Sequence, residues 1–355
     1  MAYTTINKPT EHFNTKLYTG NGGTQSITGV GFQPDLNWIK NRSDGTSHFL
    51  YDIIRGVGNN KDLSSNSSGA EGSGDGATHG FMSAFTSDGF TVTQGSSTAS
   101  ITNDSGDTYA SWNWKANGAG SANTDGSISS TVSANTTSGF SIVSYSGTSS
   151  NGTIGHGLNS APKMVIVKAL ASGRDWMTYH KSVGATKYLF LNATDASASS
   201  SGIWNDTDPT STVVHLGSSN SVNGNGINYI AYCFAEKQGY SKISSYVGNG
   251  SNNGSFCYTG MKPSFVMYKN STASATNWQI HDSKRSPYNL SVNRLNPNDS
   301  SVELGTTADS FDFLSNGFKA RATASNSNTS GSTYIYMAFA EAPLVGSNNV
   351  PCTAR

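Results

Sequence analysis

The sequence predicts an all-β protein, built as a tandem array of three similar antiparallel β-sandwich domains of the jelly-roll or lectin-like kind. The composition is polar yet aromatic-rich, with 10% aromatic residues, 39 glycines and only 12% charged residues in 355 positions. Short alternating apolar segments are separated by turn signals such as Asp88-Gly89, the pattern of sandwiches rather than of helical proteins. The same motifs also occur three times along the chain, which indicates repeated units.

Each repeat opens with an aromatic strand that ends in glycine: FNTKLYTG from Phe13, FSIVSYSG from Phe140 and YSKISSYVG from Tyr240. A proline-led strand follows, PDLNWIK from Pro34, PKMVIVK from Pro162 and PSFVMYK from Pro263. The sixth residue after each proline is a lysine, namely Lys40, Lys168 and Lys269. Each face of a strand takes alternate residues, so these lysines share the face of the apolar residues before them.

Three further motifs follow in the same order. An L-x-x-N element occurs as Leu63 with Asn66, Leu189 with Asn192, and Leu290 with Asn293. A turn-and-strand pair, SDGFTV at 87–92 and SNGFKA at 315–320, is missing from the middle repeat. Each repeat closes with an aromatic strand: YASWNW from Tyr109, YIAYCF from Tyr229 and YIYMAF from Tyr334. Apolar or small residues on both faces of this strand predict that it is central in its sandwich.

These motifs place the repeats at 13–118, 139–238 and 240–343, between tails at 1–12 and 344–355. About 100 residues is enough for an independent domain, so the array is expected to consist of separate sandwiches. Residues 119–138 are rich in Gly, Ser and Thr and poor in apolar residues, which predicts a linker. Exposed sheet edges pair readily with a neighbour, so the two tails are candidate docking strands.

The recurring lysines are candidate catalytic groups. A buried ammonium needs a partner or a lowered pKa. The interpretation we favour is structural: each lysine lies at a strand end, where its ammonium either extends to solvent or pairs with an acid such as Asp52 or Asp282. A general-base or Schiff-base lysine is the alternative.

No catalytic residues, metal ligands or cofactor are predicted. The chain lacks a GxSxG element, and its histidines do not recur at equivalent positions. The closest acid pairs, Asp206 with Asp208 and Asp104 with Asp107, lie in turn-like sequence where carboxylates usually cap turns. Three cysteines without CxxC spacing exclude a typical zinc site, whereas calcium binding by a loop is left open.

Sugar binding needs only exposed aromatic faces with amides or hydroxyls nearby. Trp204, in the loop SGIWNDTD, has no counterpart in the other repeats. It is therefore the candidate aromatic platform, with Asp206 and Asp208 as accompanying ligand-binding residues. The alternative is that Trp204 packs over its own sandwich, because tryptophan is usually mostly buried.

The net charge and the hydropathy of the sequence argue against nucleic acid and membranes as binding partners. Twenty-two basic and 22 acidic residues give a net charge of zero, which disfavours nucleic acid and anionic membranes. No segment approaches the roughly 18 apolar residues of a membrane span, and no signal peptide is visible at the start.

The motifs resemble a family of virion proteins of tailed bacteriophages, especially marine ones. The matching segments are FNTKLYTG, GVGFQPDLNWIKNRS, NTTSGFSIVSYSGTSSNGTIGHGL, APKMVIVK and MAFAEAPLVGSNNVPCTAR. The resemblance implies a non-enzymatic structural protein, made in the bacterial cytoplasm, located on the virion and bound to other virion proteins. It supplies no catalytic residues.

Within the virion, we expect an exposed tail or tail-fibre-associated adhesin whose sandwiches contact host surface glycans. The alternative is a capsid decoration, or cement, protein on the head, whose three repeats mimic a trimer. The sequence also leaves open an enzyme acting on host polysaccharide and assembly of the chain into a homotrimer.

Overall fold

The computed structural model describes residues 3–171, 173–345 and 351, and these are almost entirely β-structure. The all-β sandwich fold class is confirmed, with 41% strand and 4% helix. The described helices are single turns: η1 (Pro9–Glu11), α1 (Gly76–His79), α2 (Ser201–Trp204) and η2 (Thr307–Asp309). No helix in the described ranges is long and apolar enough to cross a membrane.

Each repeat, called unit 1 (13–118), unit 2 (139–238) and unit 3 (240–343), contributes one large antiparallel inner sheet. In unit 1 its order is β1 (Phe13–Thr19), β8 (Thr108–Trp114), β3 (Leu36–Asn41), β4 (Phe49–Asp52), β5 (Leu63–Ser64). Unit 2 repeats this order with β11 (Phe140–Ser146), β18 (Asn228–Phe234), β13 (Met164–Ala169), β14 (Met177–His180), β15 (Lys187–Phe190) and β16 (Ala198–Ser199). Unit 3 does so with β19 (Ser241–Val247), β27 (Thr333–Pro343), β21 (Met261–Asn270), β22 (Gln279–Asp282), β23 (Asn293–Leu295) and β24 (Leu304–Gly305). The aromatic closing strand therefore lies between the opening and proline-led strands in every unit.

A smaller outer sheet covers one face of each inner sheet. It consists of β2 (Gln25–Thr28), β7 (Gly89–Thr93) and β6 (Phe81–Thr86) in unit 1, and of β20 (Phe256–Tyr258), β26 (Gly317–Ala320) and β25 (Phe311–Leu314) in unit 3. In unit 2 it has only β12 (Gly152–Gly155) and β17 (Val213–Leu216). The middle unit lacks the third strand, and α2 packs against β15 and β17 there.

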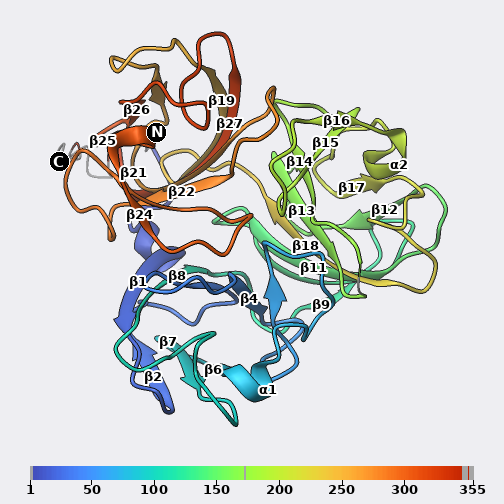
Figure 1. Cartoon of the computed structure of the whole chain (residues 1–355). Coiled ribbons are helices and arrows are strands. Elements are labelled where there is room, and N and C mark those ends of the chain that lie inside the picture. Colours follow the sequence, from blue (N-terminus) through green and yellow to red (C-terminus); the bar gives the residue numbers. More distant parts are fainter. Residues whose placement is uncertain (1–2, 172, 346–350, 352–355) are drawn as a thin grey trace.

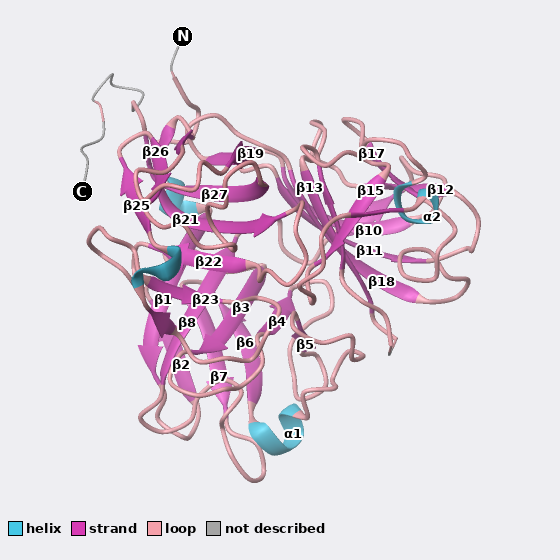
Figure 2. Ribbon diagram, turned by 45° about the horizontal axis from the view of Figure 1, so that its top comes forward, coloured by secondary structure: helices cyan, strands magenta, loops and turns pink. Residues whose placement is uncertain are grey.

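The second faces of the three inner sheets meet in one shared core, around which the units lie as three lobes (Figures 1 and 2). Trp114 of unit 1 lies at its centre, with ring centroids 6.5 Å from Phe140 and 5.7 Å from Phe339. The expectation of three separate sandwiches is therefore wrong. Each inner sheet buries one face under its own outer sheet and the other against the neighbouring units.

The predicted linker at 119–138 is also wrong. It contains β9 (Ser121–Asn123) and β10 (Ser130–Asn135), which pair with each other and extend the unit 2 sheet beyond β11 to eight strands. Two apolar side chains in this segment, Ile128 and Val132, are buried in the unit 2 core. Two buried apolar side chains are enough to hold this Ser/Thr-rich segment as a strand, because the neighbouring strand β11 supplies its backbone hydrogen bonds.

The N-terminal segment is held by the fold. Ile6 is buried in the shared core, and the Tyr3 hydroxyl donates a hydrogen bond to the Gly260 carbonyl at 2.6 Å. Of the tail at 344–355, residues 346–350 and 352–355 lie outside the described residues.

Candidate functional site

The three recurring lysines lie at the ends of their strands, where their ammonium groups hold backbone carbonyls by hydrogen bonds. Lys40, Lys168 and Lys269 are fully buried. Each ammonium donates to the carbonyl of the next residue, Asn41, Ala169 and Asn270, at 2.5, 2.9 and 2.8 Å. Two also reach the preceding unit, Lys168 to the Ser68 carbonyl at 3.2 Å and Lys269 to the Thr194 carbonyl at 3.3 Å. Burial lowers the pKa of each lysine to about 8.

The predicted pairing of these lysines with Asp52 or Asp282 is wrong, because arginines hold both carboxylates. Nε of Arg55 lies 2.5 Å from Oδ2 of Asp52, and Nε of Arg285 lies 2.5 Å from Oδ2 of Asp282. The repeated Asp-x-x-Arg spacing is the sequence signal for these pairs.

Both carboxylates also join units. Oδ2 of Asp52 accepts from the Tyr232 hydroxyl of unit 2 at 2.8 Å, and Oδ2 of Asp282 accepts from Nε1 of Trp112 of unit 1 at 3.0 Å. In unit 2 the same position is His180, whose Nε2 lies 3.2 Å from the Tyr336 carbonyl of unit 3. The three contacts form a closed ring of units.

Two of the three asparagines predicted as repeat markers make equivalent hydrogen bonds. Oδ1 of Asn66 accepts from the backbone N–H of His48, and Oδ1 of Asn192 accepts from that of Trp176, both at 2.9 Å. The third equivalent is Asn298, which accepts from the Trp278 N–H at 2.8 Å.

Asn293 does not occupy the position equivalent to Asn66 and Asn192. Its side chain instead donates to the Arg285 carbonyl at 2.6 Å. The matching leucine is Leu295, which is buried, whereas Leu290 is 38% exposed. Both Leu290–Asn293 and Leu295–Asn298 have the L-x-x-N spacing, so only burial separates them.

The predicted aromatic platform at Trp204 is wrong, because this side chain is 1% exposed and lies in the unit 2 core. Its ring centroid is 6.0 Å from that of Tyr179. Trp204 fills space beneath the outer layer that lacks a third strand.

Asp206 and Asp208 do not form a site with Trp204. Asp208 joins its loop to the end of β14 by accepting hydrogen bonds from the Tyr179 hydroxyl at 2.7 Å and from Nζ of Lys181 at 2.5 Å. Burial alone would raise its pKa, but these two hydrogen bonds lower it. Asp206 is exposed, on a left-handed turn with φ of 48°.

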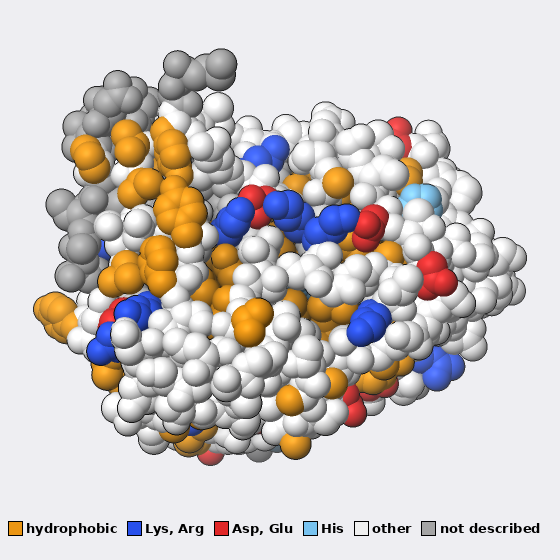
Figure 3. All heavy atoms as spheres, turned by 90° about the horizontal axis from the view of Figure 1, so that it is seen from above, with side chains coloured by type: hydrophobic (Ala, Val, Ile, Leu, Met, Phe, Trp, Pro, Cys, Tyr) orange, Lys and Arg blue, Asp and Glu red, His pale blue; other side chains and the backbone are white. Residues whose placement is uncertain are grey.

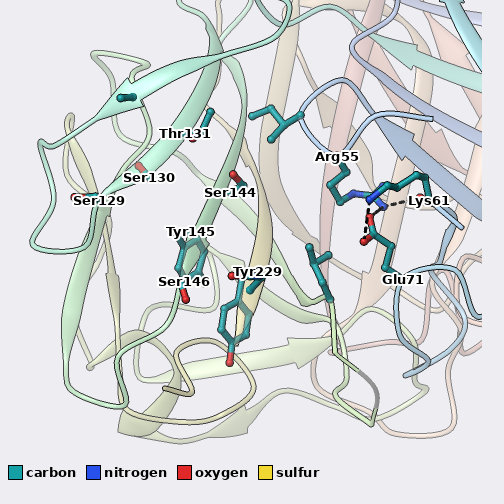
Figure 4. A pocket seen from close by; sticks show the side chains of 14 residues that line it. Arg55, Lys61, Glu71, Ser129, Ser130, Thr131, Ser144, Tyr145, Ser146 and Tyr229 are labelled. Carbon is teal, nitrogen blue, oxygen red and sulfur yellow. Dashed lines mark hydrogen bonds and ion pairs between the residues drawn. The ribbon is translucent and has the colours of Figure 1, made fainter. Parts of the chain in front are cut away.

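An open groove of about 670 Å³ lies between units 1 and 2 (Figure 4). On the unit 1 side, Arg55, Lys61 and Glu71 form a charged wall. On the unit 2 side, β10 and β11 form the other wall. Among the described strands, the hairpin of β9 and β10 has no counterpart in units 1 and 3.

The unit 2 wall presents four hydroxyl groups to the groove: Ser129, Thr131, Ser144 and Ser146. Thr131 and Ser144 are direct cross-strand partners, and the other two lie two residues along on the same face. None of the four side chains is hydrogen-bonded to another residue in the described part of the chain. Further along β11 the same face carries Phe140 and Ile142 of the shared core, so the face becomes polar where the sheet leaves that core.

The charged wall is largely self-neutralised. Oε1 of Glu71 lies 3.2 Å from Nη1 of Arg55, and its Oε2 lies 3.5 Å from Nζ of Lys61. Arg55 is also fixed by Asp52 and by the Leu50 and Lys61 carbonyls. Lys61, 34% exposed, is therefore the cation best placed to turn toward a ligand. The groove offers neutral hydroxyls, one ammonium and one carboxylate, a set suited to a polyhydroxylated ligand.

Fold and groove together define an all-β protein with three sandwich units around one core and a hydroxyl-lined groove between two of them. The chain belongs to the protein family described as "Domain of unknown function (DUF7483)", which matches residues 8–343 and so spans all three units. No curated protein and no solved structure matches the chain. The described residues contain no group of three His, Cys, Asp or Glu side chains arranged to hold a metal ion.

Proposed function

We propose that this protein is a non-enzymatic structural protein of a tailed-phage virion, exposed as a tail or tail-fibre-associated adhesin that contacts host surface glycans. It is made in the host cytoplasm and attaches to other virion proteins. The resemblance of its motifs to phage virion proteins supports the location. The hydroxyl-lined groove between units 1 and 2 is the observation that carries the glycan contact.

Groove chemistry supports a sugar as the ligand. The four hydroxyls can each donate and accept, which matches the hydroxyls of a saccharide. Each neutral hydrogen bond contributes only about 0.5–1.5 kcal/mol net, and the groove is open to solvent. Binding at one groove is therefore weak, and many copies on one particle would supply avidity.

The carboxylates of the groove support binding of a glycan without its hydrolysis. Glycoside hydrolysis normally requires two carboxylates flanking the bond, about 5–9.5 Å apart. Glu71 is the one carboxylate of the groove lining, and it is paired with Arg55 and Lys61. Asp208 is similarly held by Tyr179 and Lys181, outside the groove.

The test is binding of purified protein to host cells and to extracted envelope polysaccharide. The variant Thr131→Val/Ser144→Ala removes two groove hydroxyls and should bind about tenfold more weakly. The matched control is Thr91→Val/Ser26→Ala, an exposed cross-strand pair of the same residue types on β7 and β2. Equal binding by both variants, no binding by the wild type, or release of shortened glycan would each contradict the proposal.

Capsid decoration is the second candidate, and the closed ring of three units favours it. Asp52, Asp282 and His180 link the units in sequence around the shared core, so one chain has the form of a trimer and could occupy a local threefold position on a head. Particles lacking the protein would then lose capsid stability, whereas loss of an adhesin would reduce adsorption and leave the head unchanged.

A further inference from the structure

Unit 3 carries the exposed apolar surface of the molecule. Every large hydrophobic side chain that is exposed within the described residues belongs to it: Val247, Phe256, Tyr258, Tyr288, Leu290 and Val302. Figure 3 shows hydrophobic side chains gathered at this end of the molecule. Units 1 and 2 have none, although all three share one fold, so the fold itself does not require this exposure.

Two of these residues lie on the outward face of the unit 3 outer sheet. Phe256 is 47% exposed and Tyr258 is 54% exposed, whereas Cys257 between them is buried. Residues two apart on a strand point the same way and lie about 7 Å apart, so the two rings form one surface. β20 is an edge strand, and its described pairing partner is β26.

Units 1 and 2 serve as internal controls for this strand. Cys257 faces Phe318 just as Ile27 faces Phe90, which aligns β20 with β2. The positions of Phe256 and Tyr258 are then Ser26 and Thr28 in unit 1, both exposed. In unit 2 the buried residue of the equivalent strand, β12, is Ile154. The residues on either side of it, Thr153 and Gly155, therefore take the positions of Phe256 and Tyr258. The two rings therefore replace small residues at positions where the sandwich needs no aromatic group.

The ring of Phe256 lies along the sheet. Its Cε2 is 3.0 Å from the point where a Cβ on Gly317 would stand, so the ring covers a position that has no side chain. Across the sheet, Gly317 separates Tyr258 on β20 from Leu314 on β25. Gly317 thus leaves room for both rings on the outward face of the sheet.

A cation accompanies the rings. Lys319 on β26 is the cross-strand partner of Phe256, and its Nζ donates to Oδ1 of Asn253 at 2.6 Å, toward the β20 side. Asp312, on the other side of Lys319, is 3.5 Å from Nε of Arg321. Among the described residues Lys319 forms no ion pair, so its charge is available to an anion lying on the rings.

We propose that this aromatic face (Phe256, Tyr258 and Lys319) is a second glycan-binding site, which takes an acidic polysaccharide carrying sugar carboxylates. The apolar face of a sugar ring packs on Phe256 and Tyr258, and its carboxylate is bound by the Lys319 ammonium. This inference rests on the proposed function and adds the ligand class. The groove belongs to units 1 and 2 and the aromatic face to unit 3, so one chain offers two separate glycan-binding sites.

The test compares binding of the whole protein to polygalacturonate, an acidic polymer, and to dextran, a neutral one. Phe256→Ser/Tyr258→Thr installs the unit 1 residues and should weaken polygalacturonate binding about tenfold or more. Lys319→Thr installs the unit 1 residue Thr91 and should remove the preference for the acidic polymer, which should also decline with added salt. Tyr288→Ser, an 80% exposed aromatic outside the face, is the matched control and should bind as the wild type does.

Three results would overturn the inference. The first is unchanged polygalacturonate binding by the Phe256/Tyr258 variant. The second is equal loss in the Tyr288 control. The third is a wild-type dimer in sedimentation that the Phe256/Tyr258 variant makes monomeric, because the face would then join two copies. If the aromatic variants bind normally while the groove variant does not, this inference fails and the proposed function stands. If the wild type binds no glycan at all, both fail.

Discussion

Removing Arg285 alone should cost much more stability than neutralising it together with Asp282. Both side chains are fully buried, 2.5 Å apart, and Asp282 also accepts from Trp112 of unit 1. Arg285 in addition lies 5.5 Å from the centre of the Trp112 ring. The variant Arg285→Met would leave an unpaired buried carboxylate, whereas Asp282→Asn/Arg285→Met would leave an amide that can still accept from Trp112.

The contacts of Asp282 set the expected difference in unfolding free energy between the single and the double variant. Breaking a buried pair from one side costs about 3–5 kcal/mol, whereas replacing both partners is often near neutral. In Arg285→Met the Asp282 carboxylate would keep the Trp112 bond and two backbone N–H bonds, from Lys284 and Arg285. We therefore expect a loss of about 3 kcal/mol for the single variant and about 1 kcal/mol for the double variant. Unit 2 shows that the fold accepts a neutral group here, because its equivalent residue is His180.

Urea unfolding followed by tryptophan fluorescence is the assay, and the four corners of the double-mutant cycle give the coupling energy. Lys8→Met, which removes an ion pair in which both side chains are more than half exposed, is the control and should change stability by less than about 1 kcal/mol. The reasoning is refuted if the single and double variants lose equal stability, or if Arg285→Met behaves like the control. Separate transitions for the three units would refute the shared core.

Three other predictions concern titration and packing. Burial lowers the pKa of five histidines, His12, His48, His156, His180 and His281. Below about pH 6.5 the unfolded chain binds protons that the native chain does not, so stability should fall from pH 7 to pH 5 by up to about 1.4 kcal/mol per histidine per pH unit. A flat profile in thermal melts would contradict this. The buried lysines, with pKa values lowered to about 8, act in the same direction at higher pH, because between about pH 8 and 10.5 the unfolded state again binds more protons than the native state. Stability should thus rise from pH 7.5 to about 9, before tyrosine and cysteine ionisation in the unfolded chain reverses it, and Lys269→Met should show a shallower rise. Trp204→Ala should cost about 3–5 kcal/mol by opening a core cavity while leaving the glycan affinity of the folded protein unchanged; a selective loss of binding without loss of stability would restore Trp204 as a ligand residue.

Local pattern was sufficient for the strands of the fold. The proline-led and closing strands carry apolar residues on one face, and strands are found where this pattern predicts them. They span six or seven residues in units 1 and 2 and 10 and 11 residues in unit 3. The pattern also indicated that the closing strands are covered on both faces. It could not show what covers the second face, because a neighbouring unit and a unit's own outer sheet require the same apolar residues.

The misplaced elements share one cause, which is contact between segments distant in sequence. β10 has few apolar residues and is held as a strand by pairing with β11. Trp204 is buried in the unit 2 core, where its ring lies against Tyr179, 25 residues earlier in the chain. The groove combines residues 54–71 with residues 122–146 and 228–229, and no local motif predicts that meeting. Comparison of the repeats would have singled out Phe256 and Tyr258, since they replace small residues at aligned positions.

Localisation of the protein on intact particles, by immunogold labelling or cryo-electron microscopy, tests the proposed adhesin most directly. We expect labelling at the tail or the fibre tips, where a glycan-binding groove between units 1 and 2 would meet the host surface. Uniform labelling of the head would contradict the adhesin and establish decoration instead, with the ring of three units acting as a symmetry device. Absence of the protein from particles would contradict both.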